Sequence, residues 1–463
     1  MHTDIRETLP QEDLRWLRFV QRFDRILEDH PTFAPLRRFV YTGIYETTRP
    51  APAEPAWRIY PRYVKQFGFS LRNRLALKKA DVLIWQDVER AYMYRVVNVL
   101  LDMLDQRGRS SALLIKESLT GERLARVPLR IYPDTVSALP PEANGFAKRV
   151  VDAFGEESQI DLKPHVEAAL RQFYGYARVF RRVIDAVEPR AVIFTYDQFL
   201  PSATLAGLAG ARGASTFVLQ HGAANPFQYP LQAGRLLAWG ERDKQYYQRL
   251  GMPESAIRVV GSILHDGFVP RKNTRPRKNR ILLLSNGNNT DRNGDLPRIA
   301  YDWLRRLQEE HPAKYQIFVR YHPGELEVFK TLGTAFDQSL NGVAIDAAIS
   351  EADLVVGYVS TALLESVLLG RPVLQLLDPG GRRLCDFWEH GVTTAVRDYD
   401  DFKKRIHTVC ADTENYEAVV RAQGRRIHPY FHNYSHARTA TLDQIDTAMH
   451  DTPRGHGDSQ EYQ

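Results

Sequence analysis

Short apolar runs rich in β-branched residues alternate with longer amphipathic segments from about residue 80 onward. This alternation is typical of a parallel sheet whose strands are joined by crossover helices. In the first half of the chain, the pattern predicts strands at 81–85, 112–115, 191–195, 216–219, 236–239 and 258–260. It predicts helices between them at 92–106, 166–187, 202–211 and 241–250. Together these segments predict one doubly wound α/β unit.

The alternation stops at 266–279, where prolines and basic residues replace the apolar periodicity, and then it restarts. No regular element is expected to persist through such a stretch, so it is interpreted as an interdomain linker. Beyond it, the pattern predicts strands at 281–284, 316–320, 343–345, 354–357 and 373–376, with helices at 296–310 and 361–369. A second, smaller α/β unit is therefore expected.

The same pattern divides the whole chain into six segments of different character. They are an N-terminal helical extension (1–75), a first Rossmann-like domain (76–268), the linker (269–279), a second Rossmann-like domain (280–413), C-terminal helices (414–450) and a disordered tail (451–463). A chain of 463 residues is too long for one hydrophobic core, which agrees with this division.

Charge narrows the choice of partners only slightly, because 62 basic and 56 acidic residues leave a net charge of +6. No zinc-finger spacing and no RNA-binding aromatic motif is present, so nucleic acid is not a predicted partner. Basic clusters at 72–79 and 271–280 are interpreted as a solvated helix face and a polar linker. Contact with an anionic membrane surface or an anionic acceptor is the alternative.

Two cysteines, Cys385 and Cys410, cannot build a disulfide framework and have no metal-site spacing, which favours a reducing cytoplasm. The amino terminus lacks the apolar region of a signal peptide. No apolar run reaches the roughly 18 to 20 residues that span a bilayer. We therefore expect a cytoplasmic protein, with any membrane contact peripheral and at the inner face.

The strongest chemical signal follows the predicted strand 354–357, because ligands of open α/β sheets bind beyond the carboxyl ends of strands. Ser360 and Thr361 begin a predicted helix there, where hydroxyls and free backbone N–H groups suit a phosphate. Glu365 lies about one turn further along the same face and could accept hydrogen bonds from a ribose diol. The alternative is a capped helix with a surface glutamate. Apolar neighbours of Glu365 weigh against that alternative, since an unpaired carboxylate in a buried helix would be costly.

Two further segments of the second domain suit the same ligand. His322 and Pro323 come directly after a predicted strand, and a histidine there can donate a hydrogen bond to a phosphate or protonate it as the nucleotide leaves. Ser285, Asn286 and Gly287 form a small polar loop suited to close approach of a phosphate or sugar. A simple turn is an equal alternative for that loop.

The first domain offers candidates for proton transfer. His221 follows a predicted strand and precedes a glycine, so it is a candidate for substrate contact or proton transfer, the alternative being a histidine bonded within its loop. Asp87, Glu117 and Asp197 also follow predicted strands, and each could deprotonate an acceptor hydroxyl. Spacing does not rank the three carboxylates firmly, and Asp197 is slightly favoured.

Four stretches together resemble bacterial GT-B glycosyltransferases of surface polysaccharide biosynthesis. They are Gln220-His221-Gly222; Leu237-Ala238-Trp239-Gly240 leading to Val259-Val260-Gly261-Ser262; His322-Pro323; and Ser360-Thr361 to Glu365 with Gly370-Arg371-Pro372. The resemblance covers about residues 190–380. It is closest to capsule-type transferases that use CMP-activated acidic sugars (Kdo or sialic acid) and to CDP-glycerol glycerophosphotransferases.

The resemblance implies the GT-B fold, with two Rossmann-like doubly wound parallel-sheet domains facing across a cleft. It also implies a donor nucleotide on the second domain, with His322, Ser360 and Thr361 at the phosphate and Glu365 at the ribose. The acceptor would approach from the first domain. Many UDP-sugar enzymes have glycines where this chain has the hydroxyl pair, which is more like the CMP-sugar enzymes. No metal or other cofactor is expected, because helix dipole, hydroxyls and histidine would stabilise the departing phosphate.

We therefore expect an enzyme, a metal-independent glycosyltransferase with a nucleotide sugar as co-substrate. It would move a sugar, with an acidic sugar from a CMP-sugar favoured, to a glycan or lipid-linked acceptor. Two alternatives remain open. One is transfer of a polyol phosphate from a CDP-alcohol, in which His221 and His322 would work on the phosphoryl group. The other is a catalytically silent GT-B module that binds a glycan or a partner protein.

Overall fold

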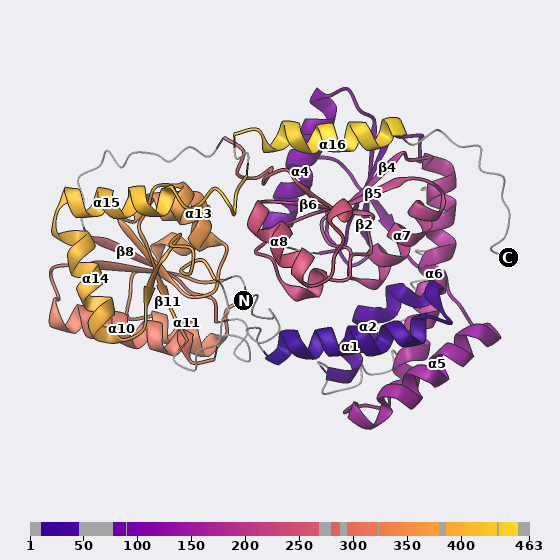
Figure 1. Ribbon diagram of the computed structural model, residues 1–463, viewed down its shortest axis with the longest axis horizontal. Helices are drawn as coiled ribbons and strands as arrows, with labels where there is room; N and C mark the ends of the chain where they lie inside the picture. The colour runs from indigo at the N-terminus through magenta and orange to yellow at the C-terminus, as the bar shows by residue number, and fades with distance from the viewer. Residues whose placement is uncertain are drawn as a thin grey trace. The chain divides into compact units, whose positions relative to one another are not determined.

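The computed structural model describes residues 11–45, 77–88, 90–267, 279–287, 294–322, 324–378, 386–432 and 435–451. The chain divides into two compact units. The N-terminal unit consists of Arg15–Asp266 and His436–Gln463, and the C-terminal unit is built mainly of Gly267–Ser435. Figure 1 shows the elements of each unit.

The N-terminal unit contains a seven-stranded, wholly parallel sheet in the order β3-β2-β1-β4-β5-β6-β7. Its strands are β1 (Val82–Gln86), β2 (Ser111–Lys116), β3 (Leu129–Ile131), β4 (Ala191–Phe194), β5 (Ser215–Leu219), β6 (Arg235–Ala238) and β7 (Ile257–Val259). The six predicted strands are confirmed, each end lying within one residue of its predicted position. β3 was not predicted, because it is three residues long and has Arg130 at its centre.

Helices cover both faces of this sheet, as the alternation of side chains along β1 requires. Val82 and Ile84 pack into a core cluster with residues of α4 and α16, while Trp85 meets the ring of Phe180 on α6 at 5.1 Å. The α-helices are α1 (Gln11–Leu27), α2 (Arg37–Tyr45), α4 (Ala91–Gln106), α5 (Pro141–Phe154), α6 (Leu162–Val187), α7 (Leu200–Ala211), α8 (Glu241–Arg249) and α16 (Ala437–Asp451). Short 3-10 turns are η2 (Pro31–Leu36), η3 (Gly155–Glu157), η4 (Pro226–Gln228) and η5 (Glu254–Ala256).

The last helix, α16, belongs to the N-terminal unit although it follows the C-terminal unit in sequence. Its apolar face buries Ile445 and Met449 in the core cluster that α4 also lines. Asp446 on the same helix pairs with Arg107 at 2.9 Å and with Arg109 at 2.8 Å. The sequence pattern predicted this helix but not the unit on which it packs.

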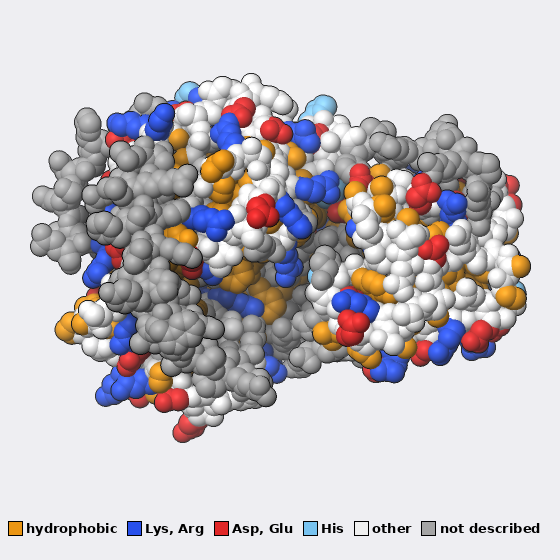
Figure 2. All heavy atoms as spheres, turned by 180° about the vertical axis from the view of Figure 1, so that it is seen from behind, with side chains coloured by type: hydrophobic (Ala, Val, Ile, Leu, Met, Phe, Trp, Pro, Cys, Tyr) orange, Lys and Arg blue, Asp and Glu red, His pale blue; other side chains and the backbone are white. Residues whose placement is uncertain are grey.

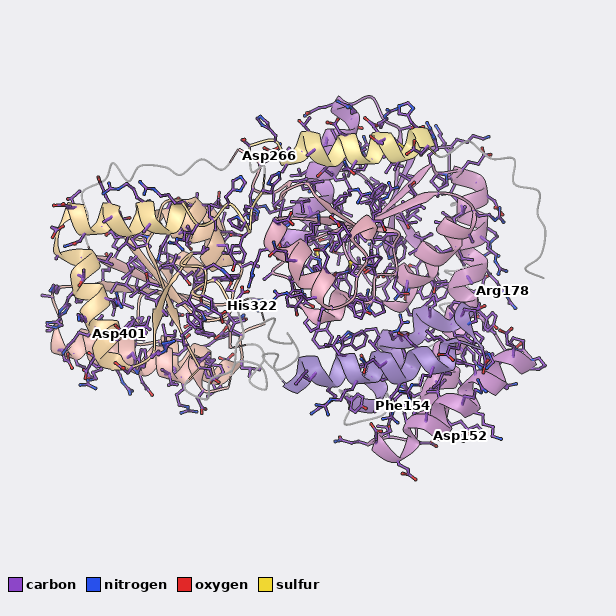
Figure 3. All side chains as sticks on the ribbon, viewed as in Figure 1. Asp152, Phe154, Arg178, Asp266, His322 and Asp401 are labelled. Carbon is purple, nitrogen blue, oxygen red and sulfur yellow. The ribbon has the colours of Figure 1, made fainter. Side chains whose placement is uncertain are left out.

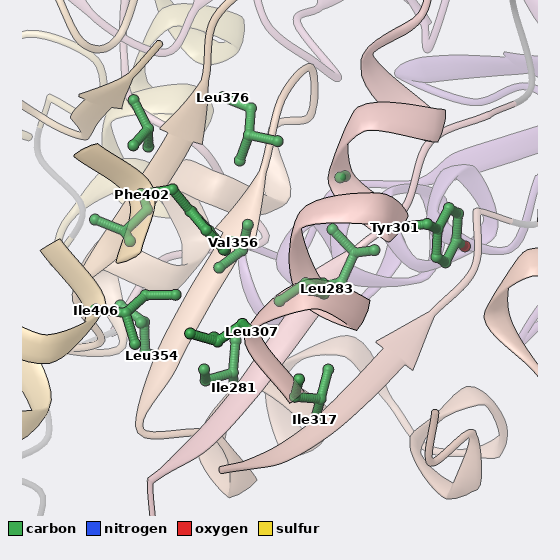
Figure 4. Close-up of a cluster of buried hydrophobic side chains, with 14 of the residues drawn as sticks. Ile281, Leu283, Tyr301, Leu307, Ile317, Leu354, Val356, Leu376, Phe402 and Ile406 are labelled. Carbon is green, nitrogen blue, oxygen red and sulfur yellow. The ribbon is translucent and has the colours of Figure 1, made fainter. Parts of the chain in front are cut away.

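The C-terminal unit contains a five-stranded parallel sheet in the order β12-β11-β10-β8-β9. Figure 4 shows its core, where apolar side chains of the central strands meet those of α10 and α14. The strands are β8 (Arg280–Leu284), β9 (Gln316–Arg320), β10 (Leu354–Gly357), β11 (Val373–Leu376) and β12 (Thr394–Val396). The helices are α10 (Leu296–Glu310), α11 (Glu327–Gly333), η6 (Ser339–Gly342), α12 (Ile345–Glu351), α13 (Ala362–Leu368), α14 (Tyr399–Ala411) and α15 (Thr413–Gly424).

One predicted strand, 343–345, is wrong. Val343 follows the 3-10 turn η6, and Ile345 is already the first residue of α12. The short apolar run continues into Ala348 and Ile349, which are buried at helical spacing. A run of three apolar residues therefore marked the start of a helix, which periodicity cannot distinguish from a strand over so short a length.

Several predictions concern residues outside the described ranges. The predicted linker 269–279 and tail 451–463 lie there except for their flanking residues 279 and 451. Most of the two basic clusters also lies there, as does Cys385, while Cys410 is partly buried. Figure 2 shows basic and acidic side chains interspersed over the described surface of one face. None of the described helices is long and apolar enough to span a bilayer.

The docking of α16 gives a test of the N-terminal unit. Ile445 is fully buried, so we expect Ile445→Ala to lower the free energy of unfolding by about 2 to 5 kcal/mol, through lost apolar contacts and the cavity left behind. Thr447→Ala on the exposed side of the same helix is the control and should change stability much less. Urea unfolding measures both. Equal effects of the two substitutions would contradict the observed packing.

Candidate functional site

Three loops meet at the carboxyl edge of the C-terminal sheet. β10, β8 and β9 are neighbours in this parallel sheet, so the segments that follow them emerge at the same edge. The backbone N–H of His322, after β9, donates to the carbonyl of Ser285, after β8, at 3.0 Å. The side-chain amide of Asn286 donates to the carbonyl of Val359, after β10, at 2.5 Å. The structure thus brings the three predicted segments of this unit onto one hydrogen-bonded edge.

A buried carboxylate, Glu325, holds two of these loops together. Its Oε1 accepts a hydrogen bond from the Ser285 hydroxyl at 2.6 Å, and its Oε2 accepts one from the backbone N–H of Gly287 at 2.9 Å. The sequence interpretation missed this role, although Glu325 stands three residues after His322. A buried carboxylate is costly unless it is well hydrogen-bonded, and these donors meet that requirement.

Ser285 and Gly287 consequently have structural roles that differ from the predicted ligand contact. Ser285 is almost fully buried, and its oxygen also receives a hydrogen bond from the Tyr301 hydroxyl at 3.1 Å. At Gly287, an added Cβ would lie 2.3 Å from the Phe329 ring and 2.7 Å from the Glu325 carboxylate. The glycine is therefore required by protein neighbours, and Asn286 is the residue of this loop whose amide reaches the next one.

His322, labelled in Figure 3, is half-buried directly after β9. Its Nδ1 accepts a hydrogen bond from the backbone N–H of Gly324 at 3.0 Å. An accepting Nδ1 leaves the proton of the neutral imidazole on Nε2, which is then a hydrogen-bond donor. The predicted nucleotide contact at Pro323 lies outside the described residues.

The segment after β10 differs from its prediction by one residue. Thr361, not Ser360, is the N-cap of α13, and its side chain makes no capping hydrogen bond. The Ser360 oxygen accepts from the backbone N–H of Ala362 at 3.2 Å, which leaves the hydroxyl proton able to donate elsewhere. Glu365, half-buried on α13, lies within electrostatic range of Arg320 at the end of β9. Burial lowers the pKa of Arg320, and the Glu365 carboxylate acts in the opposite direction.

In the N-terminal unit, Asp87 follows β1 at the carboxyl edge of the sheet and is only 8% exposed. Its Oδ2 accepts a hydrogen bond from the Ser202 hydroxyl at 2.8 Å, while Oδ1 makes no hydrogen bond of ordinary geometry with the described residues. Burial raises the pKa of Asp87 to about 6; Ser202, the Trp85 indole and the Lys116 ammonium only partly oppose this effect. A carboxyl with such a pKa changes protonation near neutral pH.

His221 follows β5 at the same edge and is surrounded by aromatic rings. The ring centroids of Tyr196 and Tyr92 lie 5.5 Å and 6.0 Å from that of His221. Burial lowers the pKa of His221 to about 4, and the Arg90 guanidinium adds to this effect. The imidazole is therefore neutral at physiological pH.

The remaining two predicted carboxylates, Glu117 and Asp197, differ in their burial and in their hydrogen-bond partners. Glu117, after β2, is half-buried and accepts a hydrogen bond from the Tyr176 hydroxyl at 2.9 Å. Asp197, after β4, is fully buried, and burial raises its pKa. Its Oδ1 accepts from the side-chain amides of Gln198 at 2.9 Å and Gln228 at 2.5 Å.

The other oxygen of Asp197 is equally occupied, because Oδ2 accepts from the backbone N–H groups of Gln232 at 2.7 Å and Ala233 at 2.8 Å. A general base must reach a substrate proton, and a fully buried carboxylate with four protein donors does not. Asp197 therefore anchors the loop that follows β5, which corrects the preference for it as catalytic base. Among the described residues, no group of three or more histidine, cysteine or acidic side chains could hold a metal ion.

The opposite pKa shifts of Asp87 and His221 give a prediction for stability. The folded protein keeps the Asp87 proton up to about pH 6, whereas the ordinary pKa is 3.8, so this group makes stability fall as pH rises between these values. His221 takes up its proton only below about pH 4 when folded, against 6.5 ordinarily, so it makes stability rise over much the same window.

We expect Asp87→Asn to give a steeper rise in the free energy of unfolding from pH 4 to pH 6 than the parent protein shows. His221→Gln should give a shallower rise, and combining both substitutions should largely restore the parent slope. Urea unfolding at half-unit pH steps measures these slopes. Parallel curves for all four proteins would mean that neither group has a shifted pKa in the folded state.

The fold of this chain can be compared with those of known proteins. No protein-family profile and no curated protein sequence matches the chain. Solved structures match over most of both chains. A putative UDP-N-acetylglucosamine 2-epimerase from Listeria monocytogenes is similar with a TM-score of 0.53 and 15% identity, covering 81% of this chain and 98% of its own.

A UDP-GlcNAc 2-epimerase from Neisseria meningitidis bound to UDP-GlcNAc has a TM-score of 0.50 and 14% identity, with 79% of this chain and 99% of its own covered. A glycosyltransferase from Rickettsia africae ESF-5 has a TM-score of 0.51 and 12% identity, with 80% and 99% covered. These structures share two α/β units with parallel sheets. The chain therefore has the GT-B fold, as its resemblance implied.

Proposed function

We propose that this protein is a nucleotide-sugar-dependent glycosyltransferase whose C-terminal unit binds the donor nucleotide and whose N-terminal unit binds the acceptor. The observation that carries the proposal is the hydrogen-bonded edge of the C-terminal sheet, where the loops of Asn286, His322 and Ser360 meet. Glu325 and the Tyr358 hydroxyl, which receives the Asn286 backbone N–H at 2.7 Å, hold these loops in one arrangement. A preorganised set of donors of this kind favours an anion that develops during reaction.

On the donor side, His322 would donate from Nε2 to the phosphate that leaves with the nucleotide, and Ser360 and Thr361 would donate from their hydroxyls. Glu365 would accept hydrogen bonds from the ribose, and the Arg320 guanidinium lies within electrostatic range of this carboxylate. The hydroxyl pair at Ser360 and Thr361 supports a CMP-linked donor, and we propose an acidic sugar as the transferred group.

On the acceptor side, we propose Asp87 as the general base. Above about pH 6 it is ionised, and its buried Oδ1 lacks a donor of ordinary geometry among the described residues, so an acceptor hydroxyl brought against it would supply the missing hydrogen bond. In the transfer step the hydroxyl proton moves to Asp87, the acceptor oxygen bonds to the anomeric carbon, and the bond between that carbon and the phosphate oxygen breaks. His221, neutral and partly exposed, would orient the acceptor. The acceptor is proposed to be a glycan or a lipid-linked glycan, reached by peripheral contact with the inner face of the membrane.

Sugar epimerisation is a second candidate, because UDP-N-acetylglucosamine 2-epimerases are among the solved structures that share this fold. Product analysis separates the candidates. A new glycosidic bond supports transfer, a phosphodiester bond supports polyol-phosphate transfer, and an altered nucleotide sugar formed without any acceptor supports epimerisation.

Nucleotide binding can be tested without knowing the acceptor. In a thermal-shift comparison of CMP, CDP, UDP and GDP, we expect one nucleotide to stabilise the protein, by about 2.7 kcal/mol at a hundredfold excess over its dissociation constant. His322→Ala should weaken that nucleotide about tenfold or more, since a hydrogen bond to a charged group is worth about 1.5 to 3 kcal/mol. His428→Ala, at an exposed site in the same unit, is the control. If no nucleotide stabilises the parent protein, the silent binding module is favoured instead.

The choice of base has its own test. We expect Asp87→Asn to lower kcat by about a hundredfold or more, because it removes general base catalysis, while nucleotide binding is retained. Glu117→Gln should keep most of the activity, since its carboxylate is already engaged by Tyr176. Initial rates at saturating donor and acceptor measure both variants. The reverse ranking would assign the base to Glu117.

A further inference from the structure

A tryptophan of the first described helix is hydrogen-bonded to the loop that begins at His221. Trp16, on α1, is fully buried. Its indole Nε1 donates to the carbonyl of Pro226 at 2.9 Å and to that of Tyr229 at 2.8 Å. These two carbonyls bracket the short turn η4 (Pro226–Gln228), so one N–H group holds both ends of the turn.

A second side chain of the extension holds the same turn from α2. The guanidinium of Arg38 lies 4.4 Å from the ring centroid of Phe227, within cation–π range. It also lies 5.4 Å from the ring of Trp16. The ring centroids of Trp16 and Phe227 are 5.6 Å apart, so Phe227 is packed between an indole and a guanidinium.

Asp197 also holds this loop, through hydrogen bonds to its carboxylate. That carboxylate accepts from the Gln228 side chain within η4 and from the backbone N–H groups of Gln232 and Ala233 beyond it. The backbone N–H of Asn225 faces the Tyr247 hydroxyl at 3.4 Å. The loop from His221 to Ala233 is therefore held between the helical extension and the residues that follow β4.

Packing of the extension against α6 and α7 requires only apolar contact, yet the extension also supplies a hydrogen-bond donor to a loop at the carboxyl edge of the sheet. That edge is where ligands of parallel α/β sheets bind, and His221 is the first residue of this loop. Loss of the indole donor would remove the hydrogen bond to the Tyr229 carbonyl and leave the buried Pro226 carbonyl with only the backbone N–H of Tyr229, which weakens the attachment of the loop.

We propose that Trp16 is a positioning residue for the acceptor: it fixes the loop that starts at His221, so that the helical extension governs acceptor binding and leaves donor binding unaffected. This inference rests on the acceptor side of the proposed function. Arg38 acts with Trp16, because it holds Phe227 in the same turn.

The test uses Trp16→Phe, which keeps an aromatic ring and removes the indole N–H, and Arg38→Met, which keeps bulk and removes the charge. Trp303→Phe, a partly buried tryptophan on α10 of the C-terminal unit, is the matched control. Amide hydrogen exchange of the full chain is followed by mass spectrometry. We expect both variants to exchange about tenfold faster in the peptide covering 222–233, with unchanged exchange in β4 and β8, whereas the control changes neither.

A second readout separates positioning from general destabilisation. With acceptor and donor supplied, Trp16→Phe should raise the acceptor KM about tenfold, with kcat at saturating acceptor and the donor KM within twofold of the parent. A proportional loss of donor and acceptor affinity would show a global defect and overturn the proposal. Unchanged exchange at 222–233 would overturn it as well.

The exchange measurement does not depend on turnover. Faster exchange confined to 222–233 in a protein that transfers no sugar would retain the role of Trp16 in holding the loop and reject the glycosyltransferase function. Normal transfer with unchanged exchange and an unchanged acceptor KM in both variants would retain the function and reject the positioning role.

Discussion

Loops that leave the carboxyl edge of a parallel sheet carry backbone N–H groups that no strand pairs, and buried groups of this kind must find an acceptor. Each unit of this protein meets the constraint with one buried carboxylate. Glu325 accepts the backbone N–H of Gly287 in the C-terminal unit, and Asp197 accepts those of Gln232 and Ala233 in the N-terminal unit. The shape of both candidate half-sites depends on these two side chains.

A carboxylate whose oxygens are bonded to protein donors cannot act on a substrate, which limits the candidates for the general base. Asp197 and Glu325 each bond to donors through both oxygens, so neither is available to a substrate. Asp87 has only one oxygen bonded by a described side chain, which is why it replaces Asp197 as the proposed base. Buried carboxylates at one sheet edge can therefore have opposite roles, and the distinction lies in their donors rather than in their burial.

Much of the fold was predictable because strands and helices with long apolar periodicity are locally encoded. The strand β10 and the helix α10 begin and end where the pattern places them. Over three residues periodicity does not distinguish a strand from other structure, so β7 was predicted while β3 and β12 were missed, and the run at 343–345 began a helix. The segments at Asn286 and His322 could be predicted to meet, because the carboxyl ends of neighbouring parallel strands lie at the same edge of a sheet. The role of Asp197 could not, because three of its four donors stand more than thirty residues later in the chain and local spacing cannot reveal them.

Burial raises the pKa of Asp87 and lowers that of His221, and both residues lie at the same edge of the N-terminal sheet. It keeps Asp87 protonated up to about pH 6 and His221 neutral down to about pH 4, because both shifts disfavour the charged form. At neutral pH the pair consists of one carboxylate and one neutral imidazole. A hydroxyl acceptor would then meet one group able to take its proton and another able to hold it by hydrogen bonding without adding positive charge. Both states exist together only above the pKa of Asp87, so any proton transfer at this edge should decline as the solution becomes acidic through that pKa.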